Sequence, residues 1–413
     1  MRIILVSIFL VLLLSVASYG DESIVVLQNE LTWKVYRELR EPAQNIVFSP
    51  IDLFSNLIHV YAGARGETRA EISRAFGFED IFTDYTANAL HMGYELDRYL
   101  ALLEGQSHCD GYRLKRCNSM WVHEGYEIAT DYSEYIKLAR DMDLRHVDFT
   151  SGLRNVSEQL GRWAWACSQE GSKLLRIKDL WSRDTRVLII SMMDFKGTWA
   201  QPFDLADTRD DEFHVSESSI CTVQMMHQKQ TFILREYDEV RILELQYSSG
   251  SGSSSCRKLA NRLSFFILLP RLGISLSDIE NKLTGSVVTE WLSEKGYRYA
   301  DIYIPQFSIA RNYKFKKIFE DLGVSRPFST DEADFSGIND KELLYVCDIY
   351  QNSFISIDEE GTTARSLGAV RLDLLGSPEY SEFRVDHPFI FFIRDNDSGL
   401  VLLAGRVINP EDK

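Results

Sequence analysis

The segment Gly361-Thr-Thr-Ala-Arg-Ser-Leu-Gly-Ala-Val-Arg-Leu-Asp-Leu-Leu-Gly-Ser-Pro-Glu-Tyr-Ser-Glu-Phe383 lies between two segments that have the apolar character of buried strands. Its even positions carry small or apolar side chains, whereas its odd positions mostly tolerate water. A strand with one buried face requires this alternation. Because the segment begins with glycine and contains Gly376-Ser-Pro378, we expect a loop in one state and a strand in another. A surface loop with accidental alternation is the alternative. The even column consists of Thr362, Ala364, Ser366, Gly368, Val370, Leu372 and Leu374.

The composition indicates a globular chain. Its 413 residues carry a formal net charge of −16, with 45% hydrophobic and 12% aromatic residues. This apolar content is sufficient for a large core, which excludes a disordered chain. The negative charge argues against nucleic acid or an anionic membrane surface as a main partner. Folds built on large sheets can use this length as one domain, and no linker or internal repeat divides it.

The first twenty residues have the pattern of a secretory signal. They contain the single charge of Arg2, the apolar run from Ile3 to Val16, and then small residues. The run is shorter than the roughly 20 residues that a membrane-spanning helix needs. Cleavage after Ala17 or after Gly20 fits equally well. We therefore expect residues 1–20 to be a signal peptide and residues 21–413 to form a single secreted, extracellular domain.

Six cysteines, at positions 109, 117, 167, 221, 256 and 347, are dispersed along the chain. None forms a Cys-x-x-Cys pair, so we expect no structural zinc. In an oxidising compartment Cys109 and Cys117 could close a short disulfide loop, and buried free thiols are the alternative.

Three further segments have the polar composition of surface loops. The glycosylation sequons at Asn155 and Asn396 lie in polar surroundings. Residues 248–256 are rich in serine and glycine and separate two strand patterns, which predicts a flexible surface insertion.

The order of patterns along the chain predicts an α+β fold, because helical periodicity dominates the first third and strand patterns dominate the rest. Ser49 can cap a helix that begins at Pro50, a residue without an amide hydrogen. Thr68-Arg-Ala-Glu71 has the pattern of a capping box for the next helix. Val187-Leu-Ile-Ile-Ser-Met-Met-Asp-Phe195 is apolar on both faces, which places it at the centre of a sheet.

The common enzyme motifs are missing from the sequence. It contains no Gly-x-Ser-x-Gly elbow, no His-Glu-x-x-His helix and no Gly-x-Gly-x-x-Gly turn. The eight histidines are scattered, and none pairs with a neighbouring Cys, His or carboxylate at ligand spacing. We therefore expect no catalytic residues, no metal and no cofactor, although a site assembled only in three dimensions would leave no such trace.

Several motifs, taken together and in this order, resemble the serpin family over nearly all of the chain after the signal. They are Asn45-Ile-Val-Phe-Ser-Pro50, Gly63-Ala-Arg-Gly-Glu-Thr-Arg-Ala-Glu-Ile72, Phe195-Lys-Gly-Thr-Trp199, Pro202-Phe-Asp204, Thr208-Arg-Asp-Asp-Glu-Phe-His-Val215, Phe266-Ile-Leu-Leu-Pro270, Ile304-Pro-Gln-Phe307, Ala333-Asp-Phe-Ser-Gly-Ile338, Phe354-Ile-Ser-Ile-Asp-Glu-Glu-Gly-Thr362 and Asp386-His-Pro-Phe-Ile-Phe-Phe-Ile-Arg394.

The resemblance implies one domain of about nine helices and three sheets, with a protease-exposed reactive loop at about 359–383. It also implies a mechanism. A target serine protease attacks the loop as a substrate and forms an acyl-enzyme. The loop then enters the main sheet and distorts the protease before hydrolysis is complete. The hinge of this movement would be Glu359-Glu-Gly361.

The resemblance places the attacked carbonyl fourteen residues beyond the hinge glycine, at Leu375, so that Leu375–Gly376 is the expected scissile bond. Counting back from Asp386 instead points to Ser377. A leucine suits chymotrypsin-like or elastase-like proteases. Arg371 is the trypsin-like alternative, but cleavage there would shorten the inserted strand.

The chain departs from the family pattern where the sheet must open. The expected sheet-opening region comprises Ser49, Asp52, Ser191, Trp199 and Tyr350. At the positions that we assign to Asp52, Ser191 and Tyr350, the family usually has Ser, Asn and His, respectively. A hydrogen-bond cluster beneath the sheet is therefore expected to be rebuilt or weakened.

Other departures concern the hinge. Arg365 and Leu367 replace the usual small residues, although both fall on the outward column. Gln306 stands where a lysine often pairs with the hinge Glu359, so we expect no salt bridge there. The weakly basic segment 85–103 gives no sign of a heparin site, and we expect a monomer.

Two functions follow from the resemblance. The first is a secreted inhibitor that traps a serine protease covalently. The alternative is a non-inhibitory serpin that acts as a carrier, chaperone or storage protein. Non-inhibitory members tend to place bulky, charged or proline residues in the inward column, and this chain has none from Thr362 to Gly368, which favours inhibition.

Overall fold

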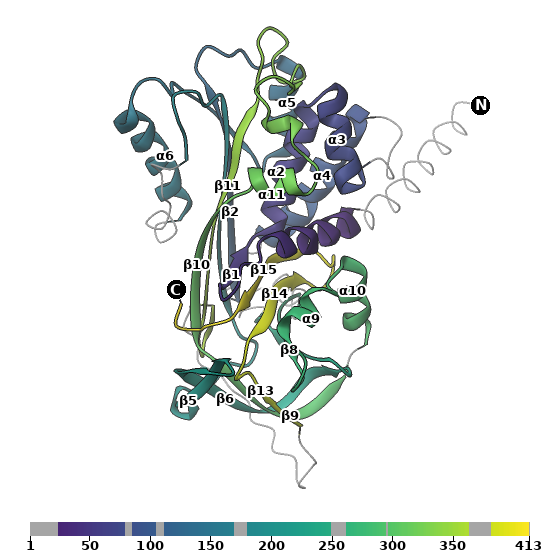
Figure 1. Ribbon diagram of the computed structural model, residues 1–413, viewed down its shortest axis with the longest axis vertical. Coiled ribbons are helices and arrows are strands. Elements are labelled where there is room, and N and C mark those ends of the chain that lie inside the picture. The colour runs from purple at the N-terminus through teal and green to yellow at the C-terminus, as the bar shows by residue number, and fades with distance from the viewer. Residues whose placement is uncertain are drawn as a thin grey trace, which may run out of the picture.

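The computed structural model describes residues 24–78, 85–104, 111–168, 180–248, 262–294, 296–362 and 381–412. Figure 1 shows a long sheet with helices on both faces in one half of the molecule and a second, strongly curved sheet in the other half. The expected signal peptide, nearly all of the Ser/Gly insertion and the loop from residue 363 to 380 lie outside the described residues.

The long sheet has six strands in the order β10-β11-β4-β2-β3, and a short strand, β12, also pairs with β4. The pairs β11–β4 and β2–β3 are parallel, and the others are antiparallel. As expected, β4 lies at the centre, where both of its faces are covered. The strands are β2 (Tyr112–His123), β3 (Asp143–Val147), β4 (Val187–Thr198), β10 (Phe307–Lys314), β11 (Val346–Ile357) and β12 (Gly361–Thr362).

The second sheet has nine strands in the order β1-β15-β14-β8-β7-β6-β9-β13, with β5 also paired to β6. Strand β6 is 18 residues long. One end of it pairs with β7 and the rest with β5 and β9, so it joins two halves that correspond to two smaller sheets. The strands are β1 (Ile46–Phe48), β5 (Arg209–Ser216), β6 (Ser219–Glu236), β7 (Val240–Gln246), β8 (Leu263–Pro270), β9 (Tyr297–Pro305), β13 (Ser381–Arg384), β14 (Phe389–Asp395) and β15 (Val401–Val407).

The helices divide unequally between the faces of the six-stranded sheet. In Figure 1, α6 covers one face, whereas α2, α3 and α4 gather on the other. Within the described residues no helix is both long and apolar enough to cross a membrane. The helices are residues 24–38, α2 (Pro50–Gly63), α3 (Gly66–Phe76), α4 (Tyr85–Glu104), α5 (Thr130–Ala139), α6 (Leu153–Cys167), α9 (Leu276–Glu280), α10 (Gly285–Ser293) and α11 (Lys316–Asp321), with the 3₁₀ turns η3 (Leu205–Asp207) and η4 (Arg326–Phe328).

Two apolar clusters follow from this arrangement. The larger one joins buried side chains from Ile24 to Val407 and includes one face of β4. The smaller one lies between α6 and the opposite face of β4. The α+β class, with its helices and three groups of strands, is confirmed.

One local expectation holds and one does not. Ser49 caps α2, because its hydroxyl accepts a hydrogen bond from the Asp52 amide and Pro50 is the first helical residue. Thr68 is not a cap, since α3 already begins at Gly66. The Thr68 hydroxyl instead accepts a hydrogen bond of 2.9 Å from the Asp334 amide, which joins α3 to a distant loop.

Candidate functional site

The hinge segment already occupies the end of the long sheet. Gly361 pairs with Thr198 and the next residue pairs with Gly197, so β12 is an antiparallel neighbour of β4. On its other side Gly361 forms a two-residue hairpin with Asp358 at the end of β11. Gly361, the last residue of the hinge, and Thr362, the first residue beyond it, therefore lie between β4 and β11.

Only glycine fits at position 361. Its φ is +133°, and a Cβ atom there would lie 2.1 Å from the carbonyl oxygen of Gly197. Such a backbone conformation costs a residue with a side chain about 1–3 kcal/mol, and the clash is with backbone that cannot rotate away.

We expect the substitution Gly361→Ala to release β12 from β4 and to lower the free energy of unfolding by about 1–3 kcal/mol. Urea unfolding measures the loss, and hydrogen exchange at the Trp199 amide, which donates to the Glu360 carbonyl, reports the local release. Gly125→Ala is a matched control, because that glycine also has a positive φ, of 95°, but has no atom within 4 Å of its ideal Cβ. Equal exchange at Trp199 in both variants would contradict the assignment.

Glu359 is held by neutral partners. Its Oε1 accepts hydrogen bonds from Gln306 Nε2 at 2.8 Å and from the Thr208 hydroxyl at 2.6 Å. Gln306 thus occupies the place expected for a lysine and replaces a salt bridge with an uncharged hydrogen bond. Trp199 closes the same end of the sheet, since its indole Nε1 donates to the Asp358 carbonyl at 3.0 Å and its ring stacks on Tyr247 at 4.8 Å.

Beyond the hinge, β4 and β11 pair directly along a seam. In this parallel pair Ser191 lies opposite Gln351, and Leu188 lies opposite Asp348. Odd-numbered residues of β4 face the larger cluster and α2, whereas even-numbered residues face the smaller cluster and α6. A strand that entered between β4 and β11 would have to separate this seam.

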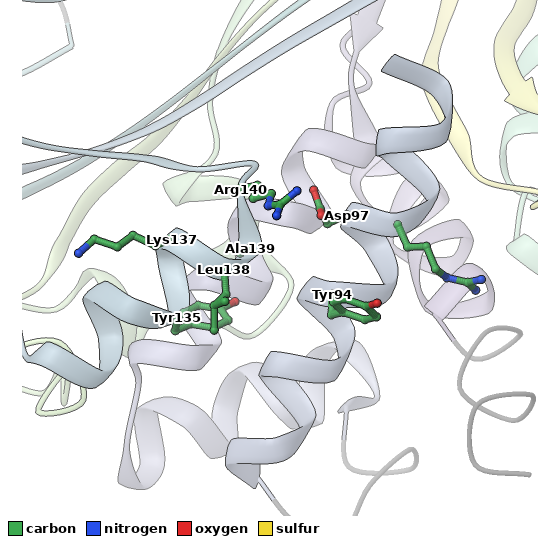
Figure 2. Close-up of a pocket in the computed structure, with 8 residues that line it drawn as sticks. Tyr94, Asp97, Tyr135, Lys137, Leu138, Ala139 and Arg140 are labelled. Atoms are coloured by element: carbon green, nitrogen blue, oxygen red, sulfur yellow. The ribbon is translucent and has the colours of Figure 1, made fainter. Parts of the chain in front are cut away.

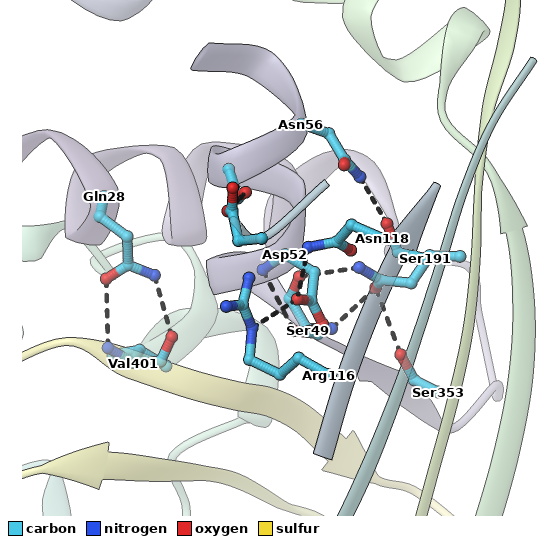
Figure 3. Close-up of polar contacts among 12 residues, drawn as sticks. Gln28, Ser49, Asp52, Asn56, Arg116, Asn118, Ser191, Ser353 and Val401 are labelled. Atoms are coloured by element: carbon cyan, nitrogen blue, oxygen red, sulfur yellow. Dashed lines mark hydrogen bonds and ion pairs between the residues drawn. The ribbon is translucent and has the colours of Figure 1, made fainter. Parts of the chain in front are cut away.

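Helix α2 and its capping residue Ser49 make hydrogen bonds to both strands of the seam (Figure 3). On the β4 side, Asn56 donates to the Ser191 hydroxyl. On the β11 side, the Ser49 amide donates to Gln351 Oε1 at 2.7 Å, and Gln351 Nε2 donates back to the Ser49 carbonyl at 2.8 Å. Ser353 also donates to Gln351 Oε1. Opening the seam must therefore move one of the two strands relative to α2.

A buried ion pair ties the same helix to β2. Arg116 Nε lies 2.7 Å from Asp52 Oδ1, and their side chains are only 2% and 0% exposed. Asn118 donates a longer hydrogen bond to the same oxygen, and the Ser49 hydroxyl donates to Asp52 Oδ2. The expected cluster is thus rebuilt around a charged pair.

The expectation for Tyr350 is wrong. Successive side chains of a strand point to opposite faces, and Gln351, one position further along β11, points toward α2. Tyr350 belongs to the smaller cluster beneath α6. A shift of one residue in matching β11 to the family pattern caused the error. The structure brings Ser49, Asp52 and Ser191 together and adds Gln351, whereas Trp199 lies at the hinge.

The outer face of the sheet carries a disulfide. It joins Cys117 on β2 to Cys167, the last residue of α6. The suggested pairing of Cys109 with Cys117 is therefore wrong, because Cys117 is already bonded. A strand residue and a helix end that meet only in three dimensions cannot be matched from spacing along the chain. Cys221 and Cys347 are free cysteines.

A second buried polar group links α2 to the end of α5. Asp141 Oδ1 lies 2.8 Å from His59 Nε2, and the Ser55 hydroxyl donates to Asp141 Oδ2. This is not the arrangement of a serine hydrolase, because Ser55 donates to the carboxylate rather than to the histidine. Burial alone would raise the pKa of Asp141, but the charge and hydrogen bond of His59 outweigh it and lower the pKa to about 2.

This shift predicts a loss of stability in acid. The folded-state pKa lies below the ordinary value, so the stabilisation is present above about pH 4 and is lost as the pH falls toward about 2, by about 2 kcal/mol in total. We expect Asp141→Asn to be less stable at neutral pH and to lack this part of the pH dependence. Urea unfolding at several pH values between 2 and 5 measures it, and an unchanged profile in the variant would contradict it.

A pocket of about 560 Å³ lies between α4 and α5 (Figure 2). Arg140 and Asp97 lie close together in it, whereas Lys137 points away from them. Burial is the main cause that raises the pKa of Asp97. Arg98, which also lines the pocket, is paired with Glu95. The described basic side chains thus do not converge on one point of this pocket.

The expected reactive-site residues lie outside the described residues, from Ala364 through Leu372 to Leu375, Gly376 and Ser377. Both sequon asparagines are described. Asn155 is exposed on α6, whereas Asn396 is half-buried and its amide nitrogen donates to the Ser264 hydroxyl at 2.8 Å. Among the residues that the structure describes, no group of three or more His, Cys, Asp or Glu side chains is placed to hold a metal ion.

Comparison with known proteins gives a consistent result. The model of one family, described as serpin (serine protease inhibitor), matches residues 26–410. An uncharacterised serpin-like protein of Thermococcus kodakarensis is 30% identical over 95% of this chain and 87% of its own length. Leukocyte elastase inhibitor A of Mus musculus is 30% identical over 91% of this chain and 97% of its own length.

Two solved structures share the fold. Human thyroxine-binding globulin in complex with thyroxine superposes with a TM-score of 0.80 at 20% identity, over 95% of this chain and 99% of its own. Uncleaved ovalbumin superposes with a TM-score of 0.78 at 24% identity, over 94% of this chain and 100% of its own.

Proposed function

Because the chain belongs to the serpin family, we propose that it is a secreted suicide-substrate inhibitor of chymotrypsin-like or elastase-like serine proteases. It would trap the acyl-enzyme by inserting its reactive loop into the six-stranded sheet. It is then an inhibitor and not a catalyst. One observation carries the proposal: β12 already pairs with β4 in antiparallel register at the end of the seam.

This register assigns a partner to each later residue of the loop. Continuing it along β4 from the pair Gly361–Thr198 brings Ala364 opposite Phe195 and Gly368 opposite Ser191. Directly opposed residues of a ladder share one face, and the odd-numbered residues of β4 face the larger cluster. The even column would therefore enter the core, as the alternation in the sequence requires.

The register of the inserted strand on β11 agrees with its register on β4. Continuing the hairpin pair Asp358–Gly361 along β11 brings Gly368 opposite Gln351. Ser191 and Gln351 are the residues that now pair with each other across the seam. Insertion therefore needs only sideways separation of β4 from β11, without sliding along the strand axis. Gly368, the smallest residue of the column, would stand at the position above Asn56 and Ser49.

The same two registers account for both arginines of the outward column. Arg365 would lie opposite Asp194 on β4, which is now paired with Arg113 at 3.0 Å. Arg371 would lie opposite Asp348 on β11. Burial raises the pKa of Asp348, whose Oδ1 accepts hydrogen bonds from two backbone amides. Opposite charges across a ladder stabilise the pair by up to about 1 kcal/mol, so both arginines favour the inserted state.

The length of β4 is consistent with cleavage at Leu375–Gly376. Its 12 residues would be filled when Leu372 lies opposite Val187, which leaves three residues before the acyl bond. Each new ladder hydrogen bond contributes about 1 kcal/mol net, so the total reaches about ten. That is comparable to the 5–15 kcal/mol that stabilises a folded protease. Cleavage at Arg371 would leave the ladder incomplete.

A non-inhibitory carrier, chaperone or storage role is the second candidate. The bridge from α2 to both strands favours it, because this bridge opposes opening of the seam. The buried pair of Asp52 and Arg116 strengthens the bridge by fixing α2 to β2, on the β4 side of the seam. The small side chains of the inward column favour inhibition instead.

The chain without residues 1–20 is expected to form a covalent complex with chymotrypsin or elastase that survives boiling in detergent, and a weaker one or none with trypsin. Gel electrophoresis detects the complex, and mass spectrometry of the released peptide identifies the scissile bond. Simple cleavage, with no complex and no rise in the melting temperature of the cleaved chain, would favour the second candidate.

The remaining parts of the proposal concern the chain as a whole. We propose a secreted, monomeric, single domain over residues 21–413, and one apolar cluster that spans Ile24 to Val407 supports the single domain. Asn155 is the better glycan acceptor of the two sequons, because its side chain is exposed. We propose no heparin, nucleic-acid or membrane partner, in keeping with the net charge of −16.

A further inference from the structure

The disulfide Cys117–Cys167 lies beside a basic pocket on the outer face of the long sheet. The pocket has a volume of about 390 Å³ and includes Cys167 in its wall. Cys167 is 7% exposed, and Cys117 is half-buried. The bond thus belongs to the smaller apolar cluster, and Cys167 reaches solvent where it lines this pocket. The pocket is lined by Arg113, Lys115, Trp165, Ala166, Cys167, Ser168, Asp194 and Lys196.

The charge of this pocket contrasts with that of the molecule. The chain has a formal net charge of −16, yet three cations and one carboxylate line the pocket. Their positions follow from the ladder, because Arg113 lies opposite Lys196 and Lys115 lies opposite Asp194 on the outward face of β2 and β4. Lys115 also donates to the Ala166 carbonyl in the last turn of α6. The cations therefore surround the end of the helix that carries Cys167.

Such surroundings favour one kind of reaction partner. A disulfide is broken by a thiolate, and nearby positive charge both attracts an anionic thiol and stabilises the thiolate that leaves. The exposed indole of Trp165, 53% accessible, adds an apolar wall to the pocket. We propose that Cys117–Cys167 is an exchange site for small thiols that carry carboxylate groups, and that its reduction releases α6 from β2.

The exchange balances as two steps. The incoming thiolate attacks Sγ of Cys167, the bond to Cys117 breaks, and Sγ of Cys117 leaves as a thiolate that takes up a proton from water. A second molecule of the thiol attacks the mixed disulfide and releases Cys167 in the same way. Two thiol molecules are oxidised to one small disulfide, and the protein disulfide is reduced to two thiols.

The consequence follows from what α6 covers. Its apolar cluster contains Leu188, Ile190 and Met192 of β4 and Tyr350 of β11, so it spans the seam on the outer face. With the disulfide intact, the end of α6 is fixed to β2, which pairs with β4 on the side away from β11. After reduction no covalent bond holds it there, and among the described residues the apolar packing and the hydrogen bond from Lys115 to the Ala166 carbonyl remain. In a chain with the proposed function, reduction would lower the barrier to opening the seam.

The first test follows reduction of the full chain without any protease, by alkylation and peptide mapping of Cys117 and Cys167. Glutathione, which is anionic, and cysteamine, which is cationic, are compared at equal thiolate concentration and low ionic strength. We expect glutathione to react at least about fivefold faster, and the difference to vanish at about 0.5 M salt, where surface charges are screened. Equal rates at low salt, or no reduction by either thiol, would overturn the proposal.

Two variants test whether the preference for glutathione comes from the charges of this pocket or from the overall charge of the protein. Lys196→Gln is expected to reduce the preference for glutathione at least about twofold, whereas Lys317→Gln on the distant helix α11 leaves it unchanged. An equal effect of both substitutions would contradict a local pocket. Because no inhibition is measured, the result does not depend on whether the proposed function is correct.

The second test asks whether the disulfide Cys117–Cys167 holds the end of α6 to β2. We expect the double substitution Cys117→Ser with Cys167→Ser to speed hydrogen exchange in α6 about tenfold or more, whereas Cys347→Ser, which removes a free cysteine of β11, leaves it unchanged. Unchanged exchange in the double variant would show that the disulfide does not hold the helix.

Discussion

A chain with the substitution Ala364→Glu is expected to be cleaved by its target protease without trapping it. In the proposed insertion, which continues the register of β12 on β4, position 364 would enter opposite Phe195, which is 4% exposed and belongs to the larger cluster. An unpaired carboxylate in such a place costs several kcal/mol. Insertion would stop after the first residues, and the acyl-enzyme would be hydrolysed before the protease is trapped. We expect the yield of covalent complex to fall by more than about tenfold, since about 1.4 kcal/mol already changes a partition tenfold.

Thr363→Glu is the matched control, because it places the same side chain at the neighbouring position. In the proposed register residue 363 faces outward and lies opposite Lys196, so a glutamate there gains a charge partner. We expect this variant to keep most of its covalent complex, measured on the same gels. Equal loss in both variants would contradict the register, and retention of the complex in the Ala364→Glu variant would contradict insertion as the trapping step.

The second large effect concerns stability. Replacing Asp52 with alanine leaves Arg116, only 2% exposed, without the carboxylate that lies 2.7 Å away. Removing one partner of a buried ion pair costs about 3–5 kcal/mol, because the remaining charge stays out of water. We expect the Asp52→Ala variant to lose this amount in urea unfolding of the uncleaved chain.

The substitution Glu67→Ala is a control of the same kind on the surface. Its partner is Arg74, and the two side chains are 62% and 58% exposed. Exposed pairs contribute at most about 1 kcal/mol. If both substitutions cost the same, the pair of Asp52 and Arg116 is not the stabilising contact that its burial indicates.

Local sequence signals predicted the parts of the fold that depend on neighbours along the chain. Ser49 and Pro50 mark the start of α2 because cap and first turn are adjacent in sequence. The segment from Val187 to Phe195 was predicted as a central strand because its two apolar columns need cover on both faces. The α+β class follows from the order of such segments.

Contacts between distant segments were predicted less well. Thr68 carries a capping pattern, but its hydroxyl binds Asp334, which no local pattern reveals. The family pattern predicts Tyr350 beneath the sheet, whereas the structure has Gln351 there, because an error of one residue in register reverses the face of a strand. The pairing of Cys117 with Cys167 spans 50 residues and depends on where α6 lies on the sheet. The reactive bond at Leu375 remains a prediction.

The proposed registers of the loop on β4 and on β11 agree with each other, and this agreement has a mechanical consequence. In the proposed insertion β4 and β11 would part without slipping, so every second residue of the loop would place its side chain inward. A loop shortened by two residues would fill the same gap to a smaller depth and leave its remaining side chains correctly oriented. A loop shortened by one residue upstream of Ala364 would turn every later side chain to the wrong face. In the proposed mechanism the parity of a length change would set which face each side chain meets, and its size would set how many ladder hydrogen bonds form.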